Sequence, residues 1–146
     1  MLTFPSREWC EAAARALHED AGARAALADF GAVVAGVVVE KGAGLGSDFC
    51  VLAKLAPGKP AVLSFPEDED ELEELEPDYV AFVAHDLAKS MLRAALGGGR
   101  ADPLKAILER KIRLRGDLQR IVRLVGKHEG AGLEAIRSLP THLLGD

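Results

Sequence analysis

The sequence predicts one α/β domain in which amphipathic helices accompany an antiparallel group of strands. Its 146 residues are enough for a single domain with a buried core. Residues 33–39 form an apolar run rich in β-branched side chains, which is typical of a buried strand. Residues 102–125 combine a helix start, an alternating apolar and charged segment, and a second amphipathic segment. Chain length and these two patterns together indicate the fold class.

The N-terminal part predicts two helices before the first strand. Ser6 is a good N-cap residue, and apolar side chains at helical spacing run from Trp9 to a stop near Asp20. Residues 23–29 are rich in alanine and predict a second, shorter helix.

Three strands are predicted next, as an antiparallel meander. A glycine-rich turn reverses the chain after the strand at 33–39 and leads into a second strand at 49–55. Pro57 and Gly58 predict a tight turn into a third strand at 61–65. Such short turns join antiparallel neighbours, so these strands are expected to pair in sequence order.

Residues 66–78 (PEDEDELEELEPD) contain nine acids and no lysine or arginine. Because like charges repel, this composition predicts a solvated loop or a frayed helix. The functional alternative is an electrostatic lid or an arm that docks a partner.

The second half resumes with a strand at 79–84 and a helix that begins at Asp86 and ends at the glycines 97–99. The apolar face of that helix contains Leu87, Met91 and Ala95. A last short helix is predicted at 133–139, before Pro140.

Residues 102–125, between these two helices, contain several secondary-structure signals close together. Asp102 followed by Pro103 combines an N-cap acceptor with a residue pre-set for the first helical position. Residues 111–115 alternate charged and apolar side chains, as a strand with one buried face does. Gly116 and Asp117 end that strand and cap an amphipathic helix. All three elements turn an aliphatic side toward a common interior.

This pattern resembles the C-terminal part of the sterol carrier protein type two family, a family of intracellular lipid-transfer domains. The resemblance extends more weakly upstream and so covers most of the chain. The residues that carry it are Asp102-Pro103, the strand 111–115, Gly116-Asp117 and, more weakly, Phe4 and Trp9.

The resemblance implies a single domain over residues 1–146, of α+β type, with a mostly antiparallel sheet of about five strands covered by helices. It also implies an apolar tunnel that holds a lipid. In one position the chain departs from the family pattern, because Arg110 stands where the family has a glycine before the strand lysine.

The candidate site is a set of aliphatic side chains from the second half of the chain. Without the resemblance, the plainer interpretation is an ordinary core, since composition does not distinguish a filled core from a tunnel. The resemblance favours a tunnel, and the side chains expected to line it are Leu87, Met91, Leu92, Leu108, Ile112, Leu114, Ile121, Leu124 and Val125.

Catalytic and metal-binding arrangements are not indicated. No histidine lies three or four residues from another, and the two cysteines are far apart, so neither a metal site nor a cofactor is expected. Cys50 lies in a strand without a nearby cation and is better interpreted as a small core residue than as a nucleophile. His85 and Asp86 are direct neighbours and point in different directions, which does not make a catalytic dyad. The sequence therefore predicts a non-catalytic protein.

Composition also limits the partners and the compartment. Basic residues cluster in the last third, but aromatic side chains for base stacking are almost absent, so no nucleic acid is expected. A transient contact with an anionic membrane surface is compatible with this cluster.

No apolar run approaches the roughly 20 residues of a membrane span, and the N-terminus lacks the pattern of a signal peptide. We therefore expect reduced thiols at Cys10 and Cys50 and a cytoplasmic protein.

The function predicted is the binding and transfer of a lipid, such as a fatty acid, a fatty acyl ester or a sterol-like molecule. Burial of roughly fourteen methylenes contributes about 11 kcal/mol before ordering costs, so an aliphatic lining suffices to hold a lipid. Two alternatives stay open. One is a lipid-modifying enzyme, and the other is an accessory or protein-interaction module that uses residues 66–78 and has no physiological lipid.

Overall fold

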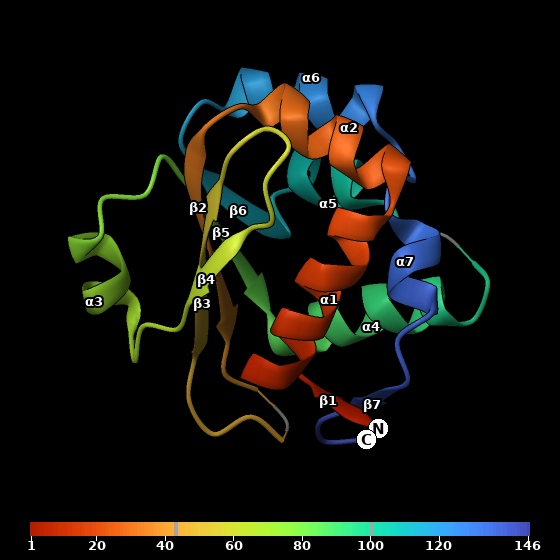
Figure 1. Ribbon diagram of the computed structural model, residues 1–146. Coiled ribbons are helices and arrows are strands. Elements are labelled where there is room, and N and C mark those ends of the chain that lie inside the picture. The colour runs from red at the N-terminus through yellow and green to blue at the C-terminus, as the bar shows by residue number, and fades with distance from the viewer. Residues whose placement is uncertain (43, 100) are drawn as a thin grey trace.

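Figure 1 shows the computed structural model, which describes residues 1–42, 44–99 and 101–146. The strands are β1 (Leu2–Phe4), β2 (Val33–Glu40), β3 (Phe49–Leu55), β4 (Val62–Ser64), β5 (Tyr79–Ala84), β6 (Ile112–Arg115) and β7 (Thr141–Leu143). The helices are α1 (Arg7–Glu19), α2 (Ala21–Phe30), α3 (Glu69–Glu74), α4 (His85–Leu96), α5 (Pro103–Leu108), α6 (Leu118–Lys127) and α7 (Leu133–Arg137).

The main sheet has five strands in the order β4-β3-β2-β5-β6. Three of its four pairings are antiparallel, and β2 pairs with β5 in parallel. This result confirms the predicted α+β class, the strand number and the meander β2-β3-β4. The parallel pair arises because the chain crosses from the end of β2 through β3, β4 and α3 before it re-enters the sheet.

The helix starts follow the local signals closely. The side chains of Ser6, Asp102 and Asp117 accept hydrogen bonds from backbone amides three residues onward, at 3.0, 2.9 and 3.1 Å, and cap α1, α5 and α6. Each satisfies a donor that the first helical turn leaves free. The start of α4 differs by one residue from the expectation, because His85 is already helical and Ala84 is the N-cap residue, without a side-chain hydrogen bond.

The sheet has one closely packed face, and it lies under α3 (Figure 1). Leu72 of α3 is 0 % exposed and sits over Gly36 of β2, where a Cβ would lie only 3.1 Å from Cδ1 of Leu72. The glycine therefore leaves the space that the leucine fills. The buried cluster on this face is Val38, Cys50, Leu52, Leu72 and Val80.

The acidic segment at 66–78 is therefore not a simple solvated loop. Asp68 caps α3 by accepting from the Glu71 amide at 2.8 Å, and acids in the first turn interact favourably with the helix dipole. Glu73 forms an ion pair with Arg115 of β6, and this is a second interaction between α3 and the sheet. Burial of one leucine and these local interactions together hold a helix despite the repulsion among its carboxylates.

Arg110 has a positive φ of 60° at the turn between α5 and β6. A left-handed conformation costs a residue with a Cβ about 1–2 kcal/mol, whereas glycine adopts it freely but loses about 0.5–1 kcal/mol more chain entropy on folding. Replacing Arg110 with glycine is therefore expected to raise the free energy of unfolding by up to about 1 kcal/mol, as measured by denaturant unfolding. An Arg110→Ala control keeps the strained φ and should gain nothing. An equal gain in both variants would contradict the conformational explanation.

Candidate functional site

Helices other than α3 cover the inner face of the sheet (Figure 1). Several side chains on this face are less buried than the cluster under α3. Strand register places Val37, Val51, Ala81 and Leu114 side by side on this face, and all four side chains are only half-buried. Residues beneath a close-packed helical layer would be almost completely buried. The layer between the sheet and the helices therefore contains accessible space.

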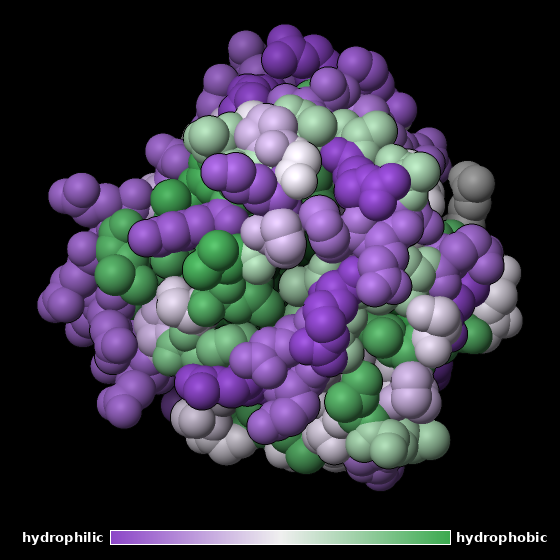
Figure 2. Space-filling view, in the orientation of Figure 1, coloured by the Kyte–Doolittle hydropathy of each residue, from purple (hydrophilic) through white to green (hydrophobic). Residues whose placement is uncertain are grey.

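An apolar cavity of about 290 Å³ opens in this layer, at the edge formed by β3 and β4. Its sheet side comes from β3 and from the β3–β4 hairpin, and its helical side from α1 and α2. In Figure 2 apolar surface gathers around a hollow between the polar front of α1 and the hairpin. The apolar lining is Trp9, Cys10, Ala13, Ala14, Leu17, Leu27, Ala28, Val51, Ala53, Leu55, Ala56, Ala61 and Leu63.

Small side chains explain why this space is not filled. Ala13 and Ala14 of α1 and Ala53 of β3 all line the cavity, in positions where a typical core would have leucine or phenylalanine. Alanine also has the highest helix propensity, so the residues that keep the cavity open stabilise α1 as well. The alanines of α1 are a signal for this site, but from the sequence alone they are not distinguishable from other apolar residues of an amphipathic helix.

The walls of the cavity are held by contacts at both ends. Trp9 donates from Nε1 to Oγ1 of Thr141 at 3.0 Å, and its ring meets Phe4 edge to face. At the end of α2, the Arg120 guanidinium donates to the Phe30 carbonyl and to the Tyr79 hydroxyl, at 2.5 and 2.8 Å. These bonds tie α1 to the C-terminal strand and α2 to the sheet.

Charged groups stand at the rim, and the interior is apolar. His18, Arg24 and Lys59 line the cavity, and Nη1 of Arg24 donates to the His18 carbonyl at 3.0 Å. Burial, with a smaller contribution from Glu11, raises the pKa of the Cys10 thiol to about 11. The thiol is therefore protonated at neutral pH, and Cys10 acts as a weakly polar part of the wall.

None of the nine side chains expected to line a tunnel borders this cavity. Ile112 and Leu114 lie on the same inner face, but on β6, at the opposite edge of the sheet. Leu108 is 65 % exposed and lies at the surface of α5. The other six are buried or half-buried on α4 and α6, namely Leu87, Met91, Leu92, Ile121, Leu124 and Val125. Their role as a lipid lining stays a prediction.

In residues 1–42, 44–99 and 101–146, no group of three or more histidine, cysteine, aspartate or glutamate side chains is placed to hold a metal ion. Over the same ranges, every helix is too short or too polar to cross a bilayer.

The architecture defines a class: the chain has the sterol carrier protein fold. It resembles a crystal structure of sterol carrier protein 2, with a TM-score of 0.70 and 19% identity over 92% of this chain and 97% of that one. A Thermus thermophilus protein, described as possibly a sterol carrier protein, matches with a TM-score of 0.68 and 18% identity, over 94% of this chain and 90% of that one. A ubiquinone synthesis protein, UbiJ-SCP2, matches with a TM-score of 0.50 and 14% identity, over 80% of this chain and 88% of that one. No family model and no curated protein matches the sequence. The fold predicted from the resemblance is thus confirmed.

Proposed function

We propose that this protein is a non-catalytic carrier that binds a lipid through its acyl chain in the cavity between α1, α2 and the β3–β4 hairpin. The observation that carries the proposal is the apolar cavity itself, opened by small side chains on the inner face of the sheet. The fold shared with sterol carrier protein 2 supports it by analogy.

The size of the cavity favours a ligand with one chain. Ligand sites typically measure about 300–1,000 Å³, and this cavity of about 290 Å³ lies at the lower end. Each buried methylene contributes about 0.8 kcal/mol, so a single acyl chain is enough for useful affinity. A fatty acid or a fatty acyl ester fits this description better than a bulky lipid.

The tunnel predicted from the sequence forms the second part of the proposal. Longer ligands would extend along the inner face from β3 toward β6, where Ile112 and Leu114 lie. The buried and half-buried aliphatic residues of α4 and α6 would then line the distal part. In this proposal residues 1–146 act as one domain in the cytoplasm, where the thiols of Cys10 and Cys50 stay free, and the lipid is collected during transient contact with a membrane.

Displacement titration tests the proposal directly. The delipidated protein is expected to bind a fluorescent fatty acid with micromolar or tighter affinity, because the apolar wall removes the chain from water. Unlabelled fatty acids of increasing length should displace the probe with increasing strength until the cavity is full. A flat titration across all chain lengths would contradict a carrier function.

One observation favours a second candidate, an interaction module that uses α3. This helix is held on the sheet by Leu72 and keeps most of its acidic side chains in solvent, as a docking surface for a basic partner would. Native mass spectrometry of the purified protein separates the two candidates, since a carrier should retain lipid and an interaction module should not.

A further inference from the structure

A second hollow, of about 300 Å³, opens directly beside the apolar cavity. The two share four lining residues, so they are direct neighbours. The rest of the second hollow is much more polar. We call it the polar groove, and its lining is Glu11, Ala14, Arg15, His18, Glu19, Pro60, Ala61 and Leu63.

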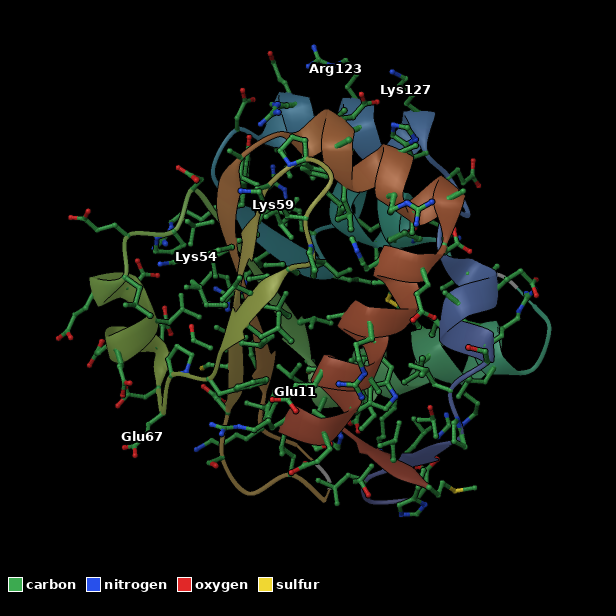
Figure 3. The ribbon with its side chains drawn as sticks, viewed as in Figure 1. Glu11, Lys54, Lys59, Glu67, Arg123 and Lys127 are labelled. Carbon is green, nitrogen blue, oxygen red and sulfur yellow. The ribbon has the colours of Figure 1, made fainter. Side chains whose placement is uncertain are left out.

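The charges of the polar groove lie on one side of α1 in a mixed pattern. Glu11, Arg15 and Glu19 follow one another at intervals of four residues, so an arginine stands between two glutamates on the same helical face. Figure 3 shows Glu11 projecting from the front of α1 and Lys59 from the β3–β4 turn. The groove therefore runs along α1 beside the hairpin, next to the opening of the apolar cavity.

Among the described residues, these charged side chains have no ionic partners of their own. The spacing of Glu11, Arg15 and Glu19 permits ion pairs within the helix. Nevertheless, in the part of the chain that the structure describes, no ion pair involves any of the three. The side chain of His18, which borders both hollows, also makes no hydrogen bond to another described residue. The three charged side chains and the His18 ring are available to a ligand that extends out of the apolar cavity.

We propose that the polar groove selects a single-chain lipid whose head carries both charges, a phosphate diester next to an ammonium group. The inference rests on the proposed function, because the acyl chain must occupy the apolar cavity. The phosphate would lie near Arg15 and His18, and the ammonium would lie near Glu11 and Glu19.

Simple anionic and neutral heads fit the groove less well. Within the groove, a fatty acid carboxylate would meet Glu11 and Glu19 besides Arg15, so part of its attraction to Arg15 is cancelled by repulsion. Held instead by Arg24 or Lys59 at the rim of the apolar cavity, the carboxylate would leave the charges of the groove unused. A single hydroxyl would leave all three charges without an ionic partner. A head with both charges satisfies the arginine and the glutamates together.

Competition between two ligands of equal chain length tests this selectivity. Lysophosphatidylcholine and free fatty acid, each with a 14-carbon chain and below their micellar concentrations, compete for the delipidated protein against a fluorescent fatty acid. The lysolipid is expected to displace the probe at a concentration at least tenfold lower. Doubling the salt concentration should reduce this preference, because the head contacts are ionic and solvent-accessible.

A variant that removes two charges from the polar groove tests whether the groove causes the preference for the lysolipid. Glu11→Gln/Glu19→Gln is expected to weaken lysolipid binding at least tenfold and to leave fatty acid binding equal or stronger. The matched control is Glu69→Gln/Glu74→Gln, which removes the same charge from α3 on the other face of the sheet. The control should change neither affinity. Thermal melts of both variants verify that they are folded.

The outcomes separate this inference from the proposed function. If neither ligand binds, the apolar cavity is not a lipid site and the proposed function fails as well. If both bind equally, or if the groove variant weakens both to the same extent, the carrier function stands and the head selectivity is overturned. The inference is supported only if the protein prefers the lysolipid and the Glu11→Gln/Glu19→Gln variant loses that preference.

Discussion

Replacing Ala53 with phenylalanine is expected to lower the affinity for a fatty acid at least tenfold, equivalent to about 1.4 kcal/mol. Ala53 lies on β3 and lines the apolar cavity. A ring at this position would occupy ligand space instead of colliding with packed atoms. Stability should therefore change by less than about 1 kcal/mol, since overpacking penalties apply to filled cores. Lipid titration and denaturant unfolding of the same variant give both numbers.

A matched substitution in a closed environment provides the control. Ala106 of α5 is 7 % exposed and lies outside the cavity, so Ala106→Phe should cost about 1–3 kcal/mol of stability. The two variants add the same atoms, and the difference between them reports whether the space around Ala53 is open. Equal destabilisation of both variants, or normal lipid binding by Ala53→Phe, would mean that the lipid lies elsewhere.

Truncation of Leu72 to alanine is expected to produce the largest loss of stability, about 2–5 kcal/mol. Leu72 is the only residue of α3 that is fully buried, and its contacts with Gly36 lie in the centre of the packed face. Without it, the repulsion among the neighbouring carboxylates is opposed mainly by the Asp68 cap and the ion pair with Arg115. Denaturant unfolding measures the loss, and amide exchange should become fastest in residues 67–76.

Leu75→Ala serves as the comparison, because Leu75 closes the same helix but is 47 % exposed. Its truncation should cost well under about 1 kcal/mol, in proportion to the small area that it buries. Comparable losses in both leucine variants would show that helix propensity, and not the contact with the sheet, holds α3 in place.

The sequence by itself determined the elements that depend on neighbouring residues. Ser6, Asp102 and Asp117 begin helices because their side chains reach amides three positions onward, an interaction that needs no distant partner. The apolar run of β2 and the alternation of β6 likewise follow from side-chain periodicity. The resemblance to sterol carrier proteins rested on these local patterns, and for that reason it anticipated the fold correctly.

Only the tertiary structure decided the features that depend on distant residues. The three-residue strands β1 and β7 pair across almost the whole chain, and no periodic pattern is long enough to indicate them. The docking of α3 depends on the match between Leu72 and Gly36, which are 36 positions apart in the sequence. The position of the cavity depends on alanines of α1 and an alanine of β3 lining the same space. A sequence records which side chains are present, whereas a cavity is a volume that no side chain reaches, and that volume is defined only when the elements are placed together.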